Sequence, residues 1–387
     1  MVAITLEEQL TPRRTLKRFL TIKCTIANYS GFAEQRQVPV GSQPYFRNIG
    51  RGCVGEVFEV PGTTQVLKVA VNPWEDRNKL WNDYVQHQKV SDMFDKIGAD
   101  RLEVRVPRPH YFVSGKDELW WTQNQGRFPK SQDPSNILCS ERIPALSGTI
   151  RNSLVDEFFK ADTAQEVKHL DSNKDCLIRL YLGKRRQRES RFIPSLRNYQ
   201  LHLDQMEHLE LDVLEYARHM AAALAVVHWA CGLDANDIEF VLGSAPDQIA
   251  EPESATPKLL SGAEIASLAP NTSTWHTHPA RVQRKVTCLW MLNFDRCAQF
   301  ESSVSGVEML VKSFFLNDEY YPRPLGSSAK DQTLWKTFRA SYEETSGECL
   351  VMFGFTHLSH LPGVFMDMVV EEQRRRTERQ ASLALAS

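Results

Sequence analysis

A glycine-rich turn followed by a lysine is the first feature of this sequence that could do chemistry. Gly50, Gly52 and Gly55 have the G-x-G-x-x-G spacing and stand inside a strand-like stretch, not between a strand and a helix. That position argues against a dinucleotide-binding fingerprint and favours a loop whose backbone N–H groups cover phosphates. Lys68 lies in the next strand-like stretch, where its charge could pair with phosphates. A plain hairpin turn and a surface lysine are the alternative interpretation.

Two short acidic segments follow apolar stretches in the second half of the chain. Asp234, Asp237 and Glu239 come after a helix-like stretch, and Asn293 and Asp295 come after a strand-like one. Carboxylates in such places can hold a guanidinium or take a proton from a reacting group. Turn and cap positions are the alternative for the first two aspartates, because aspartate is common at both. No serine, cysteine or tyrosine is marked as a covalent nucleophile.

The most basic stretch of the chain has aromatic residues beside it. Its cations could neutralise phosphates, and the rings of Tyr181, Phe192 and Tyr199 could stack on exposed bases. A solvated helix face or loop is the alternative interpretation. The candidate RNA-binding residues are Lys184, Arg185, Arg186, Arg188 and Arg191.

Periodicity places the first group of candidates on strands and a helix. Residues 50–60 and 65–71 predict a hairpin, because a proline–glycine turn joins two alternating stretches. Apolar residues at helical spacing predict a helix over about 75–97. Further short strands are expected near residues 104–109, 118–122 and 137–144.

The second half of the chain is expected to be mainly helical. A long helix is predicted over residues 209–229, and two more over 331–344 and 364–383. His228 lies in the apolar part of the first of these and is expected to be a core histidine. Residues 244–284 hold five prolines and many small polar residues, which indicates a surface insertion or mobile loop.

Length and composition narrow the class of protein. The chain has 387 residues and a formal net charge of −2, which fits two packed lobes and excludes a polycation. Nucleic-acid contact must then come from a local patch, and neither DNA nor a membrane is expected as a partner. The longest apolar, charge-free run, residues 220–233, is too short to span a bilayer. The eight cysteines of the chain form no C-x-x-C pair, so we expect free thiols and a cytoplasmic location. No structural metal is expected either.

The candidate residues occur in the order that they have in protein kinases. The glycine-rich turn and Lys68 resemble the kinase phosphate loop and its lysine, and Asp83 stands where the lysine-pairing glutamate would be. Residues 224–238 resemble the catalytic loop, with Asp237 at its aspartate, and residues 292–295 resemble the metal-binding segment.

This resemblance covers roughly residues 45–345 and implies an α+β, protein-kinase-like two-lobed fold. It divides the chain into a small β-rich N-lobe over 45–145 and a mainly helical C-lobe over 146–387. Residues 1–44 are locally basic and are expected to be an N-terminal arm, or a helix lying across the first lobe.

Three departures from the kinase pattern fall on catalytic positions. Asn236 replaces the usual arginine before Asp237, and Leu242 stands where a metal-binding asparagine is expected. Asn293 stands where a kinase has its metal-binding aspartate, with Asp295 two residues away. An amide is a poorer partner than a carboxylate for a hard dication. ATP and magnesium are therefore expected only under the alternative that the chain is a degenerate phosphotransferase.

Several stretches are similar to one fungal family of kinase-like proteins that is often labelled "zinc finger". They are residues 138–146, 179–185, 228–243, 289–297 and 317–324. That family is identified as including the arginine-containing cyclodipeptide synthases, which join arginine and a second amino acid from charged tRNAs into a diketopiperazine. The resemblance implies a tRNA-dependent enzyme of fungal secondary metabolism that uses aminoacyl-tRNAs and needs no cofactor.

Under this resemblance the cleft residues take defined roles. Lys68, Asp234, Asp237 and Glu239 are expected to serve catalysis. Because an aminoacyl ester is already activated, loss of the metal ligands is compatible with turnover. A kinase-like binding protein without turnover is the third interpretation. Substrate- or phosphate-binding positions are expected at Gly50, Gly52, Gly55, Asp83, Glu141, Asn293 and Asp295.

Overall fold

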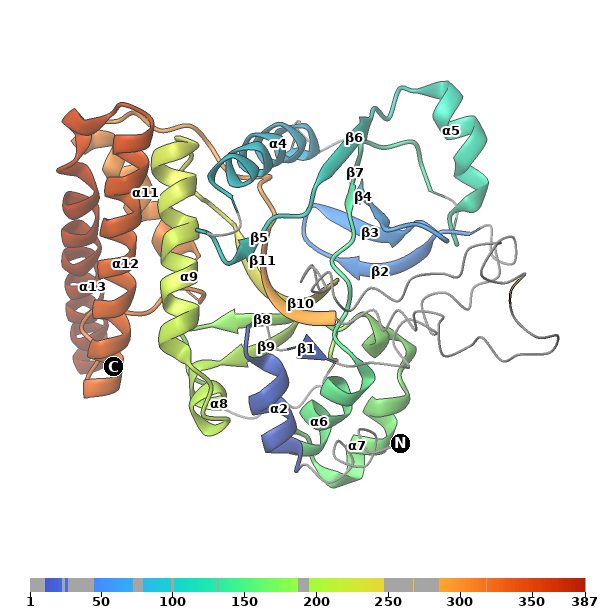
Figure 1. Ribbon diagram of the computed structural model, residues 1–387, viewed down its shortest axis with the longest axis horizontal. Coiled ribbons are helices and arrows are strands. Elements are labelled where there is room, and N and C mark those ends of the chain that lie inside the picture. Colours follow the sequence, from blue (N-terminus) through green and yellow to red (C-terminus); the bar gives the residue numbers. More distant parts are fainter. Residues whose placement is uncertain are drawn as a thin grey trace.

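The computed structural model is an α+β protein with two β-sheets and ten α-helices among the residues that it describes (Figure 1). One sheet lies above the other in this view. The described residues are 11–22, 25–26, 45–71, 79–98, 101–130, 132–186, 195–246, 267, 285–317 and 319–386.

The first sheet holds the glycine-rich turn, which joins its first two strands. A hydrogen bond of 2.8 Å from Gly52 N to the Gly55 carbonyl closes the turn. A Cβ on Gly55 would lie 2.8 Å from Lys68 Cγ, so a glycine is needed where the two strands run side by side. The hairpin predicted from residues 50–60 and 65–71 is confirmed, because residues 55–59 pair antiparallel with residues 66–70. Neighbouring strands are all antiparallel, in the order β2 (Arg47–Arg51), β3 (Gly55–Glu59), β4 (Gln65–Ala70), β7 (Ile137–Glu141) and β6 (Pro109–Val113).

Two helices accompany this sheet. α4 (Lys79–Ile97) packs against β6 and β7 and confirms the predicted helix over the described residues. The strand predicted near residues 118–122 is wrong, because this stretch forms α5 (Glu118–Asn124). Asp117 caps that helix by accepting the Trp120 backbone N–H at 3.0 Å. Trp121 is then buried in the small core under the first sheet.

The second sheet lies in the part of the chain that was expected to be mainly helical. Its longest pair, β10 and β11, is antiparallel from Glu239 opposite Leu292 to Pro246 opposite Lys285. The prediction of a mainly helical C-lobe is therefore incomplete. Of the predicted insertion, residues 244–246 belong to β10, and residues 247–266 and 268–284 lie outside the described residues. The strands are β1 (Thr25–Ile26), β11 (Lys285–Leu292), β10 (Glu239–Pro246), β8 (Ile178–Tyr181) and β9 (Tyr199–His202), with β5 (Val104–Arg105) also paired to β11.

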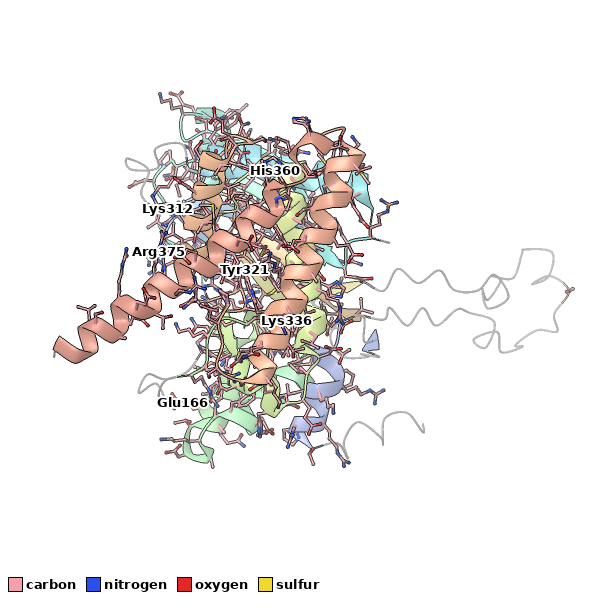
Figure 2. The ribbon with its side chains drawn as sticks, turned by 90° about the vertical axis from the view of Figure 1, so that its left-hand side faces the viewer. Glu166, Lys312, Tyr321, Lys336, His360 and Arg375 are labelled. Carbon is pink, nitrogen blue, oxygen red and sulfur yellow. The ribbon has the colours of Figure 1, made fainter. Side chains whose placement is uncertain are left out.

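Seven further helices of the described residues surround this second sheet. Figure 2 shows the C-terminal helix with Arg375 extending past the body of the molecule. The helix predicted over 209–229 begins later and ends in one π-helical turn, Val226–Ala230, and both predicted C-terminal helices are confirmed and longer. None of the described helices is long and apolar enough to cross a membrane. The seven are α6 (Gly148–Phe158), α7 (Ala161–His169), α8 (Leu203–His208), α9 (Val213–Ala225), α11 (Val304–Leu316), α12 (Ala329–Met352) and α13 (Leu361–Ala386).

The N-terminal helix α2 (Pro12–Leu20) packs on the larger core and not across the first sheet. Its apolar residues Leu16 and Phe19 are buried beside α6. The Tyr216 hydroxyl donates a hydrogen bond of 2.6 Å to the Leu20 carbonyl, which ties the end of α2 to α9. The expectation of a helix lying across the first lobe is therefore wrong for these residues. The apolar face of α2 is buried against α6 in the larger core.

Candidate functional site

A cavity of about 210 Å³ lies between the two sheets, under the glycine-rich turn. Its walls are largely apolar, with Val57 and Val66 from the first sheet and Val241 and Leu292 from the second. Of the sequence-predicted site residues, Asp234, Asp237 and Asp295 do not line it. Those that do are Gly50, Gly52, Gly55, Lys68, Asp83, Glu141, Glu239 and Asn293.

Lys68 is the charged centre at one end of the cavity. Its Nζ donates to Asp83 Oδ2 at 2.6 Å, to Asn293 Oδ1 at 2.9 Å and to Asp295 Oδ2 at 3.5 Å. Burial alone lowers the pKa of Lys68, but the charges of Asp83 and Asp295 outweigh it and the pKa lies above its ordinary value. The ammonium is therefore permanently charged, and protein oxygens face all three of its protons.

Asp83 connects three separate segments of the site. It lies on α4 with its side chain 3% exposed, pairs with Lys68 on β4, and accepts the Phe294 backbone N–H at 3.1 Å. The neighbouring Asn82 side chain donates to the carbonyls of Asp295 and Cys297 at 3.0 and 2.9 Å. Helix α4 therefore holds the loop after β11 in place, a role that the sequence did not show for Asn82.

Asp237 contacts Asn293, which lines the cavity, although Asp237 itself does not. The Asn293 side-chain amide donates to the Asp237 carbonyl at 2.9 Å and to its Oδ2 at 3.3 Å. Arg296 Nε lies 3.3 Å from the same Oδ2, and sequence reasoning missed this arginine. Asp237 and Asn293 have left-handed backbones, with φ of 65° and 70°, and Ala235 has a φ of 56°. Such conformations cost energy in residues other than glycine, and they commonly gather at functional sites.

Asp234 serves the structure of the loop, not the cavity. Its Oδ1 accepts the backbone N–H groups of Ala298 at 2.8 Å and Asn236 at 3.2 Å, and its Oδ2 accepts the Ser313 hydroxyl at 3.0 Å. Both carboxylate oxygens are thus occupied, which favours the alternative of a turn residue over the expected catalytic role.

His228 has the structural role that the sequence predicted. Its Nδ1 lies 2.7 Å from the Tyr342 hydroxyl, which also accepts the Trp229 indole N–H. Burial lowers the pKa of His228 to about 3, so the imidazole stays neutral. The expectation of a core histidine is confirmed.

Glu239 forms a partly buried ion pair at the floor of the cavity. Arg179 on β8 lies 2.8 Å from Glu239 Oε2 on β10, and both side chains line the cavity. Burial raises the pKa of Glu239; the charge of Asp237 adds to the rise, and the charge of Arg179 opposes it. Sequence reasoning named the glutamate but not its partner, because they come from different strands.

Asp295 lies behind the cavity wall, next to Lys68. Burial raises the pKa of Asp295, against the opposing charge of Lys68. Its Oδ1 is buried without a hydrogen-bond partner among the described residues. Asp295 therefore lies beside Lys68, although it does not line the cavity for which a binding role was expected.

A second charged cluster at the cavity edge has no signal in the local sequence. Arg47 on β2 makes two hydrogen bonds, 2.7 and 2.8 Å, to the oxygens of Asp175. Arg142 contacts Glu59 at 2.6 Å and Asp175 at 3.4 Å, and Arg197 lies 3.6 Å from Asp175. The cluster joins the first sheet to the segment before β8, beside the entrance to the cavity.

The described part of the basic segment is closely paired with acids. Lys184 contacts Glu319 at 2.7 Å, and Arg186 contacts Asp204 at 2.9 Å. Arg185 bridges Glu207 and Asp331, at 2.5 and 2.7 Å. These three cations line a separate cavity of about 590 Å³ together with Arg323. Their acidic partners reduce the local positive field, and Arg188 and Arg191 lie outside the described residues.

A family model described as "Zinc finger protein" matches residues 289–352 of this chain. The matched stretch begins within β11 and contains Asn293, Asp295, α11 and the whole of α12. No curated protein and no solved structure matches. Over the described part of the chain, no group of three or more His, Cys, Asp or Glu side chains is arranged to hold a metal ion.

Proposed function

We propose that this chain has a protein-kinase-like two-lobed fold and uses its cleft for acyl transfer between aminoacyl-tRNAs. The product would be an arginine-containing cyclic dipeptide. Three features support the fold: the glycine-rich turn between β2 and β3, the Lys68–Asp83 pair between β4 and α4, and Asp237 facing Asn293 across two loops. The similarity of several sequence stretches to the fungal synthase family supports the activity.

The site is poorly suited to phosphoryl transfer. Magnesium bound to nucleotide phosphates needs a carboxylate where this chain has Asn293, and the position of the second metal ligand is Leu242, which is fully buried. Lys68 directs its protons at Asp83, Asn293 and Asp295. It therefore serves the protein framework, and aminoacyl esters need no metal or ATP for activation.

A cluster of carboxylates around Lys68 and Glu239, where the metal-binding aspartate of kinases is absent, carries the proposal. Four of them, Asp83, Asp237, Glu239 and Asp295, act on one another electrostatically. Their cationic neighbours are Lys68, Arg179 and Arg296, so this cluster has one negative charge in excess, whereas the residues that line the whole cavity hold four cations and four anions. A cationic substrate group is favoured in such surroundings, and a guanidinium suits them because it is weakly hydrated.

The reaction consists of two aminolysis steps. The α-amine of one aminoacyl group attacks the ester carbonyl of the other, forming a peptide bond and releasing the ribose hydroxyl of one tRNA. The second α-amine then attacks the remaining ester, closes the ring and releases the second tRNA. Each amine loses a proton, and each leaving ribose oxygen gains one, so the steps balance without an oxidant or reductant.

Asp237 is the residue placed to accept the amine proton. Its side chain is 39% exposed next to Asn293, and Asn293 and Arg296 contact only its Oδ2. Its Oδ1 has no hydrogen-bond partner among the described residues, so it can face an incoming amine. Lys184, Arg185, Arg186, Arg188 and Arg191 are the proposed contacts of the tRNA backbone.

Mass spectrometry of the reaction products tests this function. Purified protein would be mixed with charged tRNAs and isotope-labelled arginine, with and without ribonuclease. The expected result is a labelled cyclic dipeptide that disappears with ribonuclease and falls strongly in Asp237→Asn but not in Glu343→Gln, a surface change on α12. Absence of any cyclic dipeptide across the full set of aminoacyl-tRNAs would refute the proposal.

A binding protein without turnover is the second candidate. The intact glycine-rich turn and the Lys68–Asp83 pair favour it, because both could hold a nucleotide without transferring phosphate. Calorimetry with ATP, with and without magnesium, on wild type and Lys68→Met distinguishes it. Lys68-dependent ATP binding without a cyclic dipeptide would favour this candidate.

A further inference from the structure

The Arg179–Glu239 pair at the cavity floor is an ion pair with unused hydrogen-bonding groups. Arg179 contacts Glu239 Oε2 and also the Tyr181 side chain, and Glu239 Oε1 has no hydrogen-bond partner among the described residues. Arg179 Nε is buried without an acceptor. Leaving such groups without partners inside a protein costs free energy, so an incomplete pair inside a cavity indicates a place for a ligand.

A buried tyrosine interacts electrostatically with the pair, although it does not line the cavity itself. Tyr320 is 6% exposed, and its hydroxyl has no hydrogen-bond partner in the described part of the chain. The charges of Glu239 and Arg179 both act on this hydroxyl. Three polar groups from β8, β10 and the segment after α11 therefore meet with part of their hydrogen-bonding capacity unused.

The register of the second sheet aims the pair at the cavity. Arg179 is opposite Val241, and Glu239 is opposite Leu292, the residue before Asn293. Because side chains alternate along a strand, Glu239 and Val241 share one face with Arg179. Val241 and Leu292 also line the cavity, so Glu239 stands on an apolar floor next to the residues of the proposed acyl transfer.

We infer that Glu239 is the residue that selects arginine, by accepting the substrate guanidinium on its Oε1, and that Arg179 positions it. This inference rests on the proposed function. A guanidinium has several donors in a plane, so it can bind Glu239 Oε1 with one of them and keep others for further acceptors. Arg179 contacts the other carboxylate oxygen, and its charge opposes the rise that burial gives to the pKa of Glu239.

Arginine is favoured over lysine and over neutral analogues by this arrangement. An ammonium is a more strongly hydrated point charge and loses more on entering an apolar cavity. Citrulline has nearly the shape of arginine but no charge, so it leaves the excess carboxylate uncompensated. The expected discrimination against citrulline is about 10-fold or more in affinity.

Calorimetric titration of the full chain with amino-acid esters tests the inference. The probes are the methyl esters of L-arginine, L-citrulline and L-lysine. Wild type and the surface control Glu343→Gln are expected to prefer the arginine ester, and Glu239→Gln is expected to bind the arginine and citrulline esters equally. Retained preference for arginine in Glu239→Gln, or no preference in wild type, overturns the inference.

A second variant covers the case in which Glu239→Gln does not fold. Glu239→Asp keeps the charge but withdraws it by one methylene, so it should weaken arginine binding and improve binding of L-homoarginine methyl ester. A purely structural role for Glu239 would not produce this exchange of preference, and its absence in a folded variant also overturns the inference.

The outcomes separate this inference from the proposed function. Binding of the arginine ester that depends on Glu239, without any cyclic dipeptide, would keep the inference and remove the function. Arginine-containing product with unchanged amino-acid selectivity in Glu239→Gln would keep the function and remove the inference.

Discussion

Lys68 Nζ lies 2.6 Å from Asp83 Oδ2, and the other oxygen of Asp83 accepts the backbone N–H of Phe294. One buried carboxylate thus joins β4, α4 and the loop after β11. Because Asp83 is the closest counter-charge of Lys68, the position of the ammonium and that of the loop depend on the same contact. This relationship makes the site sensitive to a single substitution on α4.

Asp83→Asn should destabilise the protein by about 3–5 kcal/mol, because it leaves the buried ammonium without its closest counter-charge. The shift of the urea midpoint, converted with the measured m-value, checks this number. Asp95→Asn on the same helix is the matched control: its side chain is 63% exposed, and the change should be under about 0.5 kcal/mol. Similar midpoints for the two variants would contradict the prediction.

Asp234→Asn and Asp237→Asn should fail in different ways. The first removes an acceptor from a loop in which three donors converge, and should cost about 2–3 kcal/mol in the free energy of unfolding. The second changes a partly exposed group next to Asn293, and should cost under about 1 kcal/mol but lower the cyclization rate about 100-fold. Denaturation and product formation on both variants check the contrast, and a stable but inactive Asp234→Asn would reverse the assignment.

Local patterns explain which parts of the site were predictable. The glycine-rich turn, Lys68 and the helix that carries Asp83 are each marked by spacing within a few residues, so their order along the chain predicted that they meet. Asn293 was recognisable in the same way, because it directly follows an apolar strand. These residues lie at strand and helix positions that periodicity can identify.

Contacts between distant segments were not predictable from one sequence. The two hydrogen bonds of Arg47 to Asp175 join residues 128 apart, and neither residue has a local pattern that names its partner. The same holds for Arg179 and Glu239, which meet only because β8 pairs with β10. The error at α5 has a different cause, since the capping Asp117 was a usable helix signal beside two tryptophans that suggested a strand.

The stability of the fold should fall as pH rises through the range in which Glu239 ionises. Burial raises the pKa of Glu239 above the value of about 4.3 for an unfolded chain, so the folded state binds this proton more tightly. Its contribution to the free energy of unfolding is therefore largest at low pH and is lost between the unfolded and folded pKa. Asp295, with its raised pKa, contributes with the same sign.

Urea midpoints of wild type and Glu239→Gln across pH check this dependence. The variant cannot ionise at this position, so its stability relative to wild type should improve as pH rises above about 4.3. Glu343→Gln is the control and should follow the wild-type curve, because its carboxylate is partly exposed on α12. Parallel curves for wild type and Glu239→Gln would show that the pKa of Glu239 is the same in both states.

Asn293→Asp should create sensitivity to magnesium and slow acyl transfer. Asn293 Oδ1 accepts from Lys68, which a carboxylate can continue to do, but the amide that donates to Asp237 becomes an acceptor. Two carboxylates about 3 Å apart repel each other unless a proton or a cation lies between them. Magnesium should therefore raise the melting temperature of the variant and not that of wild type. Without magnesium, its cyclization rate should fall about 10- to 100-fold.

Asn293→Leu is the control that loses the same donor without adding charge, and it should show no magnesium response. An equal response of wild type and Asn293→Asp would mean that the amide is not what keeps the dication from this site.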